Sequence, residues 1–480
     1  MPLQDVLFAY GVEFPCGGIG ECTGCRVRVL KGEIPVTLRQ EGQLSPEQLS
    51  AGWRLACCST AETDLTLEVM QWEAQVLTDA SSFPFNPREG LGIAIDLGTT
   101  TLALQLLDLR TADVLGVETG LNEQAKFGAD VMSRIQHAVT EGKSDEIRQV
   151  IRSQLGAMMR RLIESAHVDP GRVREVVIVG NTAMHHFFSG LDVGQLSHYP
   201  FTPVDPAGRS FEAADLGWTA VPEAHIRFGP CIGGFVGSDI LAGVRATRLQ
   251  ESSDLVGLID LGTNGEIVLG NRNRLVCCST AAGPAFEASS LSMGMRAVTG
   301  AITQVRAQGG GFACHVAGGG DPRGICGSGI VDAIAAGLEL RVIGLTGRIG
   351  VPTVTLMGPV RITQGDIREI QVAKAAIAAG VRILLDTLGA SLDDVRTVHL
   401  AGAFGNYVNR ESAHRIGLLP IPPERVRSAG NTALLGAKLA LFDPDESVDH
   451  ELVRHIQHVP LNAHPRFQDV FVDEMMFPGE

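Results

Sequence analysis

The segment LGIAIDLGTTTLALQLLDL, residues 91–109, places a DLGTT turn at 96–100 between two apolar runs with strand character. The segment DLVGLIDLGTNGEIVLGN, residues 254–271, repeats this pattern, with Asp260 at the position of Asp96. One such hairpin is a moderate signal, because glycine turns after strands are common. Two copies in one chain predict duplicated subdomains that face each other across a cleft.

Each turn combines the residue types that bind a nucleotide phosphate. A carboxylate at a strand end can hold Mg²⁺ directly or through water, so Asp96 and Asp260 are the candidate Mg²⁺ or water-positioning residues. Glycine lets the backbone approach a phosphate, while hydroxyls and turn N–H groups bind its oxygens. The expected phosphate-binding residues are Gly98, Thr99, Thr100, Gly262, Thr263, Asn264 and Gly265. Two such turns can grip the triphosphate of ATP from both sides.

Two further features complete this candidate ATP site. Glu266 follows the second turn and could orient the attacking water, although a solvent-exposed glutamate at a hairpin edge is an equally good interpretation. The segment VHLAGAFGNYV, residues 398–408, ends an apolar strand with small residues against which an adenine ring could lie flat. Its candidate cofactor-binding residues are Gly402, Ala403, Phe404 and Gly405. The alternative is that all three motifs are unrelated glycine turns after core strands.

The cysteines near the N-terminus indicate a second cofactor. The segment CGGIGECTGC spaces Cys16, Cys22 and Cys25 as C-x5-C-x2-C, and GWRLACC, residues 52–58, supplies a distant fourth cysteine. Three thiolates on a glycine-rich loop plus one from a distance is the arrangement that wraps a [2Fe–2S] cluster. Zinc usually takes its ligands as two short pairs, so a zinc site or a set of disulfides is the weaker alternative. The spacing therefore predicts an electron-transfer protein.

The composition narrows the class of protein and its partners. The chain has 480 residues, and this length allows about three domains. A hydrophobic content of 45% with 57 glycines indicates a well-packed, turn-rich α/β protein. The net charge of −15 opposes a nucleic-acid partner, whose phosphates it would repel. We expect no membrane partner, because there is no run of about 18 apolar residues and no basic signal region. The cysteines outside the candidate cluster are expected to be buried small residues, which fits a reducing cytoplasm.

A change in pattern separates the candidate cluster from the candidate ATP site. After the strand-like segment TDLTLEVM, residues 63–70, the chain loses periodicity and collects Ser, Pro and Asn up to residue 90. We therefore expect a [2Fe–2S] ferredoxin-like domain over 1–70, a linker over 71–90, ATPase subdomain I over 91–255, and ATPase subdomain II over 256–480. The second subdomain carries the adenosine motif and the C-terminal tail.

At this level of detail the chain resembles a known family. The three motifs resemble the phosphate-1, phosphate-2 and adenosine motifs of the acetate kinase/sugar kinase/heat-shock chaperone/actin ATPase superfamily. Phrases such as GADVMSRI (128–135), GGFVGSDILAG (233–243) and HPRFQDVFVDEMMFP (464–478) resemble the ferredoxin-fused reductive activators of corrinoid proteins. The resemblance covers nearly the whole chain. It implies an α/β fold in which a β-grasp ferredoxin-like domain precedes an actin-like ATPase of two subdomains with a nucleotide cleft.

The resemblance also implies an activity, partners and one ligand choice. ATP hydrolysis would drive an uphill one-electron reduction of an inactive cobalt(II) corrinoid to cobalt(I). The implied partners are a corrinoid-binding protein of a methyltransferase system and an upstream low-potential reductant, and a homodimer is one of the open oligomeric states. GWRLAC resembles the fourth-ligand phrase of the family, which favours Cys57 over Cys58 as the fourth ligand. The stretch before Cys16 has room for the helix of a β-grasp but not for its opening hairpin, so we expect a partial β-grasp.

Two other classes of function remain open on the sequence. One is an ATP-driven electron donor to another low-potential metalloenzyme, as the dehydratase and benzoyl-CoA-type activators of the same superfamily are. Those activators lack a fused ferredoxin-type domain, so the N-terminal cysteines favour the corrinoid activator. The other class is a small-molecule kinase with a regulatory cluster, for which no acceptor-site signature is visible. Genes for methyltransferases next to this one would separate the first two classes, and a phosphorylated product would support the third.

Overall fold

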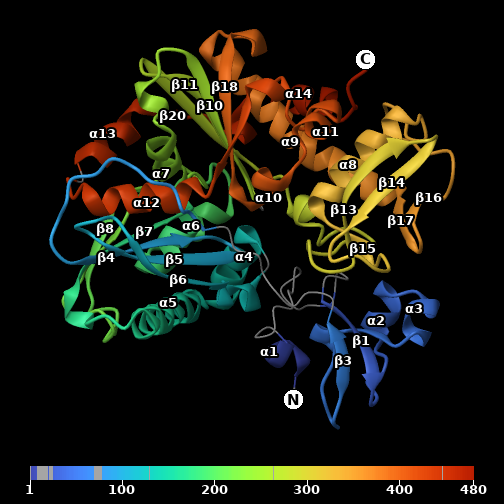
Figure 1. Ribbon diagram of the computed structural model, residues 1–480, viewed down its shortest axis with the longest axis horizontal. Coiled ribbons are helices and arrows are strands. Elements are labelled where there is room, and N and C mark those ends of the chain that lie inside the picture. Colours follow the sequence, from blue (N-terminus) through green and yellow to red (C-terminus); the bar gives the residue numbers. More distant parts are fainter. Residues whose placement is uncertain are drawn as a thin grey trace.

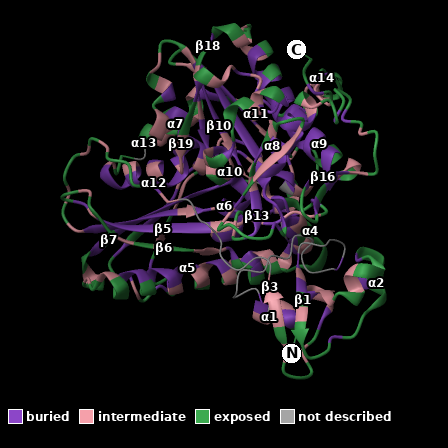
Figure 2. Cartoon of the chain, turned by 45° about the vertical axis from the view of Figure 1, so that its right-hand side comes forward, coloured by how far each residue is buried: buried purple, intermediate pink, exposed green. Residues whose placement is uncertain are grey.

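The computed structural model describes residues 2–7, 20, 25–69, 78–128, 130–262, 264–445 and 447–479. Figure 1 shows a small N-terminal domain, in blue, beneath a larger body that is built around two sheets. Each of these two sheets has six strands. Figure 2 shows that the strands of the body are largely buried, whereas the outer helices expose one face to solvent. The core of an α/β protein lies in this way between its sheets and the helices that cover them.

The N-terminal domain is a three-stranded antiparallel sheet in the order β2-β1-β3. Its elements are α1 (Leu3–Leu7), β1 (Arg26–Lys31), α2 (Leu38–Gln43), α3 (Pro46–Ser50), β2 (Trp53–Leu55) and β3 (Thr66–Val69). Leu3 and Leu7 of α1 pack with Val27 and Leu55 in the core of this domain. A short helix therefore precedes Cys16, as expected from the sequence.

The first large sheet has the order β6-β5-β4-β7-β9-β8. Its strands are β4 (Leu91–Leu97), β5 (Thr101–Asp108), β6 (Val114–Leu121), β7 (Val173–Gly180), β8 (Arg209–Glu212) and β9 (His225–Phe228). The apolar segment 91–109 forms the antiparallel pair β4–β5, and β7 and β9 continue the sheet in parallel on the other side of β4. All residues of 91–95 are buried, because the sheet is covered on both faces.

The second large sheet has the order β19-β18-β10-β11-β12-β20. Its strands are β10 (Leu255–Leu261), β11 (Gly265–Asn271), β12 (Arg274–Thr280), β18 (Val395–Ala401), β19 (Val426–Gly430) and β20 (Ile456–His458). An antiparallel β10-β11-β12 meander is extended by the parallel strands β18 and β19 next to β10. The first sheet extends its β4-β5-β6 meander with β7 and β9 in the same way. The expected duplication of an actin-like subdomain is therefore confirmed.

The remaining elements are helices and two small sheets. The helices are α4 (Val131–Glu141), α5 (Ser144–Ala166), α6 (Thr182–Ser189), α7 (Ser238–Thr247), α8 (Gly327–Glu339), α9 (Gln364–Leu388), α10 (Gly402–Tyr407), α11 (Arg410–Arg415), α12 (Thr432–Phe442), α13 (Ser447–His455) and α14 (Phe467–Asp473). The small sheets contain β13 (Ala301–Gln308), β14 (Gly311–Val316) and β15 (Gly324–Ile325), and β16 (Thr353–Met357) with β17 (Val360–Thr363).

Two helices cross between the halves of the body: α7 precedes the second sheet in the chain but packs on it, and α12 follows most of the second sheet but packs on the first. Helix α7 shares a core with β10 and β11, whereas α12 shares a core with β4 and β7. The two helices also pack against each other, and a Cβ on Gly436 would lie 2.2 Å from the carbonyl oxygen of Ala242. The predicted boundary at 255/256 falls within β10, after its first residue, and each core includes a helix from the other side of that boundary.

Residues 78–90 of the expected linker lie on the first subdomain. Asp79 forms a buried ion pair with Lys438 of α12, and the two side chains are only 6% and 1% exposed. The ring of Phe83 packs edge-on against Phe442 at the end of α12, with ring centroids 5.5 Å apart. Apolar and ionic contacts thus hold this segment against α12.

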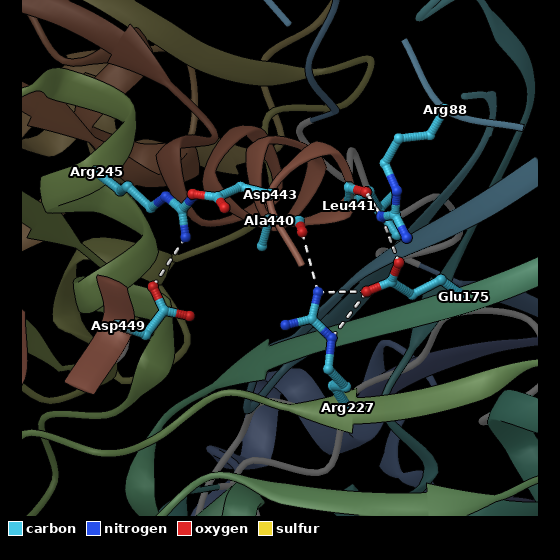
Figure 3. A network of polar contacts seen from close by, with 8 residues as sticks. All are labelled: Arg88, Glu175, Arg227, Arg245, Ala440, Leu441, Asp443 and Asp449. Carbon is cyan, nitrogen blue, oxygen red and sulfur yellow. Dashed lines mark hydrogen bonds and ion pairs between the residues drawn. The ribbon is translucent and has the colours of Figure 1, made fainter. Parts of the chain in front are cut away.

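Figure 3 shows how the end of this segment is tied to the ATPase body. Arg88 Nη1 contacts Glu175 Oε2 of β7 at 2.6 Å and also donates to the carbonyl oxygen of Leu441. Arg227 of β9 donates through Nε to Glu175 Oε1 at 2.8 Å and through Nη2 to the carbonyl oxygen of Ala440 at 3.0 Å. Cations near the last carbonyls of a helix are favourable. Residues 78–90 are therefore part of the ATPase body, and 71–77 lie outside the described residues.

Candidate functional site

The first turn, between β4 and β5, holds Asp96 near the end of a buried strand. The N–H of Gly98 donates to the carbonyl oxygen of Thr101 at 3.1 Å. A Cβ on Gly98 would lie 2.6 Å from that oxygen, so the closed turn leaves no room for a side chain. Asn431, which precedes α12, donates from Nδ2 to Asp96 Oδ2 at 2.8 Å. The start of α12 thus orients the first carboxylate.

The second turn, between β10 and β11, brings Asp260 directly opposite Glu266. Glu266 is 8% exposed, and Ser279 of β12 donates to its Oε1 at 3.2 Å. The interpretation of Glu266 as a solvent-exposed hairpin glutamate is therefore wrong. The N–H of Gly262 donates to the carbonyl oxygen of Asn264 at 3.0 Å, which closes the turn, while Thr263 lies outside the described residues.

The two turns meet at one cavity of about 330 Å³. The predicted site residues that line it are Asp96, Gly98, Thr99, Thr100, Asp260, Gly262, Asn264, Glu266, Gly402, Ala403 and Phe404. Thr99 Oγ1 accepts a hydrogen bond from Asn181 at 2.8 Å, so the first turn is also tied to the end of β7. Gly265 and Gly405 do not line the cavity. Their missing side chains leave room for Ile377 and Leu400, so both glycines serve packing.

The AGAFG motif, residues 401–405, lies close to Asp260 and also forms part of the cavity wall. Gly402 has φ +82°, and a Cβ there would lie 2.5 Å from Asp260 Oδ1 and 2.5 Å from the carbonyl oxygen of Leu261. Only glycine combines this backbone conformation with so close an approach. Phe404 stacks on Phe286, with ring centroids 4.8 Å apart and an angle of 16° between the rings. The AGAFG segment therefore positions Asp260 and adds an aromatic wall to the cleft.

A fourth and a fifth acidic residue of the cleft, Asp239 and Glu287, were missed by the sequence analysis. Asp239, in the first turn of α7, lines the same cavity as Asp96 and Asp260. Burial, together with the charges of nearby Asp260 and Asp96, raises the pKa of Asp239 to about 8. The available signal was GGFVGSDILAG, in which glycines precede an aspartate at a helix start. That phrase entered only through the family resemblance.

The pKa values of the three predicted carboxyl groups of the cleft, Asp96, Asp260 and Glu266, are also raised. Burial raises the pKa of Asp96 to about 6, against a hydrogen bond from Asn431. Burial and the charge of Asp96 raise the pKa of Asp260 to about 7, and burial raises the pKa of Glu266 well above its ordinary value. These carboxyl groups line one cavity, and oxygen ligands suit a hard divalent cation such as Mg²⁺. Within the described residues no three acidic, histidine or cysteine side chains are placed to hold a metal ion together, so Mg²⁺ would be held partly through water.

The cleft wall that faces these acids contains one basic side chain among the described residues. Arg296 lines the cavity next to Met295, and burial lowers the pKa of its guanidinium to about 10. A guanidinium is a strong donor to phosphate oxygens. Carboxylates for a metal, glycine turns, and an arginine thus surround one cavity, which is the set of groups that a metal–nucleotide complex requires.

The N-terminal cysteines are described in part. Cys25 and Cys57 have their Sγ atoms 3.3 Å apart, and the Sγ atoms of Cys57 and Cys58 are 3.6 Å apart. Two thiolates that bind one tetrahedral metal at about 2.3 Å are about 3.8 Å apart, so both distances are compatible with thiolates at one metal centre, and they do not choose between Cys57 and Cys58. Cys16 and Cys22 lie outside the described residues. The complete ligand set stays a prediction.

Comparison with known proteins places these parts in one family. A family model for the 2Fe-2S iron-sulfur cluster binding domain matches residues 2–62. A model described as the RACo middle region matches 91–252, and one described as the C-terminal, ASKHA domain of RACo matches 254–480. Within the described part of the chain, we find no helix with the length and apolar character needed to cross a membrane.

Three relatives share this organisation. The corrinoid activation enzyme RamQ of Eubacterium limosum is 35% identical over 82% of this chain and 72% of its own length. The [Co(II) methylated amine-specific corrinoid protein] reductase of Methanosarcina barkeri is 26% identical over 80% of this chain and 77% of its own. The solved structure of a reductive activator for a corrinoid, iron-sulfur protein aligns with a TM-score of 0.73 and 28% identity, over 100% of this chain and 96% of that one.

Proposed function

Since the chain belongs to the family of RACo-type reductive activators of corrinoid proteins, we propose that it uses ATP hydrolysis to move one electron from a [2Fe–2S] cluster to the cobalt(II) corrinoid of a partner protein. The cysteines of the N-terminal domain would hold the cluster, which would supply the electron that converts cobalt(II) to cobalt(I), and an upstream low-potential reductant would replace that electron. The observation that carries the ATP dependence is the cleft, in which two duplicated turns bring Asp96 and Asp260 to one cavity.

The N-terminal domain supplies the electron. Cys25 and Cys57 would hold one iron, and Cys16 and Cys22 would complete the set. When bound, the cluster supplies a one-electron carrier. The domain buries Cys25 to 1% exposure, while Cys57 stays half-buried. An electron donor of this kind needs one side of its cluster near the surface.

The cleft residues hold and orient the nucleotide. Asp96, Asp260 and Asp239 would bind Mg²⁺ directly or through water, and the metal supplies charge neutralisation for the phosphates. The two turns line the cavity, and their N–H groups other than those of Gly98 and Gly262, which close the turns, would donate to the phosphate oxygens. Glu266, held by Ser279, would orient a water against the terminal phosphate. Hydrolysis needs no acceptor hydroxyl, so the same residues support an ATPase without a second substrate.

The test mixes the reduced protein with a cobalt(II) corrinoid protein of a methyltransferase system, with and without ATP. We expect the cobalt(I) absorption band only with ATP, and its loss in Asp260→Asn. Asp254→Asn, an exposed aspartate just before β10, is the matched control and should behave as wild type. Cobalt(I) formation without ATP, or full activity of Asp260→Asn, would refute the proposal. A phosphorylated small molecule in place of phosphate would instead support a kinase.

A further inference from the structure

Among the described residues, two polar interactions join the ferredoxin domain to the ATPase body. Arg26 donates from Nη1 to the carbonyl oxygen of Ser292 at 3.0 Å. Glu68 of β3 forms an ion pair with Arg323 at 3.0 Å. Figure 1 shows the strands of this domain next to β15, which begins directly after Arg323. We call these two contacts the seat of the ferredoxin domain.

The contacts of the seat are of a kind that forms and breaks easily. The side chains of Arg323 and Glu68 are 51% and 25% exposed, so water competes with the ion pair. Glu68 also lies 3.8 Å from Arg28 of its own domain, so leaving the seat does not strip this carboxylate of its counter-charge. The two contacts of the seat can therefore break at a small cost in free energy.

On the ATPase side, the two seat residues, Ser292 and Arg323, lie directly before two segments that are hydrogen-bonded to each other. The N–H of Ile325 donates to the carbonyl oxygen of Met293 at 2.9 Å, and the N–H of Met295 donates back to Ile325 at 3.0 Å. Ser292 precedes the first of these segments and Arg323 precedes the second. The seat is thus at one end of a short hydrogen-bonded ladder.

The other end of the same ladder is the wall of the nucleotide cleft. Met295 and Arg296 follow Ser292 by a few residues and line the cavity, and so do Cys326 and Gly327, which follow β15. Ser292 itself is held by Asp366 of α9, which accepts from its N–H and from its hydroxyl, both at 2.7 Å. Ser292 is also joined to the ladder through Met293, so a shift of the ladder toward the cleft that overcomes the contact with Asp366 changes the position of the Ser292 carbonyl that Arg26 uses.

We propose that the seat is a docking site for the ferredoxin domain whose strength is controlled by nucleotide in the cleft. This proposal rests on the proposed function, because it takes the cavity to be the ATP site. A triphosphate attracts the guanidinium of Arg296, draws the 292–296 segment toward the cleft and weakens the seat. Arg26 directly follows Cys25, so the side of the ferredoxin domain that carries this cysteine faces the ATPase body when the two seat contacts are formed. When these contacts break, that side of the domain becomes accessible to the corrinoid partner.

Reciprocity makes the proposal measurable without electron transfer. If nucleotide weakens the seat, then breaking the seat must strengthen nucleotide binding by the same factor. Arg323→Glu places a like charge against Glu68 and should tighten binding of a non-hydrolysable ATP analogue about fivefold, the upper range for an exposed ion pair. The double variant Glu68→Arg/Arg323→Glu restores the pair and should return the wild-type affinity. Arg361→Glu, on an exposed position of β17, makes the same charge change away from the seat and should have no effect.

The measurement is calorimetric titration of the analogue into the full-length, cluster-loaded protein. Small-angle X-ray scattering of the wild type, with and without analogue, gives the second readout, and we expect larger overall dimensions with analogue. Equal affinity of all variants, weaker binding by Arg323→Glu, or unchanged dimensions would overturn the nucleotide-controlled seat while leaving the ATP site intact. Failure of the wild type to bind the analogue at all would overturn both.

Discussion

Replacing Gly402 with alanine should disable the ATPase through Asp260 rather than through the adenine pocket. Gly402 has φ +82°, and the new Cβ would lie 2.5 Å from Asp260 Oδ1 and from the carbonyl oxygen of Leu261, where ordinary contact begins at 3.4 Å. Asp260 must therefore move by about 1 Å, and a displacement of that size at a reacting centre costs on the order of 100-fold in rate. The left-handed backbone adds about 1–2 kcal/mol of strain for a residue with a Cβ.

A matched control separates the strain from the displacement. Gly389, after α9, has φ +66°, and a Cβ there would meet nothing within 4 Å. Gly389→Ala should lose about 1–2 kcal/mol of stability in thermal unfolding and keep its ATP turnover. Gly402→Ala should lose turnover by about 100-fold in a phosphate-release assay, with an unchanged cluster spectrum. The reasoning fails if Gly402→Ala hydrolyses ATP at the wild-type rate, or if Gly389→Ala is equally inactive.

Three other outcomes can be checked with simple variants or conditions. Cys57→Ser should lose the [2Fe–2S] absorption and Cys58→Ser should keep it, and the reverse pattern would exchange the two assignments. The pKa of Asp260 is raised to about 7 in the folded protein, so without metal its share of stability falls as pH rises from about 4 to about 7. Stabilisation by Mg²⁺ with an ATP analogue, read from melting temperatures, should therefore be larger at pH 8 than at pH 6, and an equal shift at both would contradict this. Asp79→Asn leaves buried Lys438 without its anion and should cost about 3–5 kcal/mol of unfolding free energy. The double variant Asp79→Asn/Lys438→Met should regain most of that free energy. Equal instability of the two variants would exclude the ion pair as the cause.

The hairpins of the ATPase could be predicted because they are local structures. In 91–109 and 254–271 the strand pattern, the turn residues and the partner strand all lie within one short segment, so neighbouring residues specify the pairing. The cysteine spacing at 16–25 is also read from ten neighbouring residues, and the ligand set that it indicates stays a prediction. The repeat of one hairpin then predicted the two-subdomain fold, since a duplicated unit folds alike in both copies.

The fourth carboxyl of the cleft could not be found in this way. Asp239 stands at the start of a helix, where an acidic residue is commonplace because it interacts favourably with the helix dipole. Its presence in the cleft depends on the packing of α7 against α12 from the far end of the chain. Glu266 is a similar case, because its burial comes from Ser279 on the next strand and not from the hairpin that carries it.

The segment 78–90 marks the limit of local reasoning most clearly. Its irregular, Pro- and Ser-containing sequence predicts a linker, and nothing nearby contradicts that reading. Its actual partner is Lys438, which is 359 residues away from Asp79 along the chain. Periodicity and spacing specify contacts among neighbours, and so the two turns of the ATPase follow from them. Contacts between distant segments decide which carboxylates share the cleft and which residues after the ferredoxin domain pack on the ATPase body. No short stretch of sequence encodes such contacts.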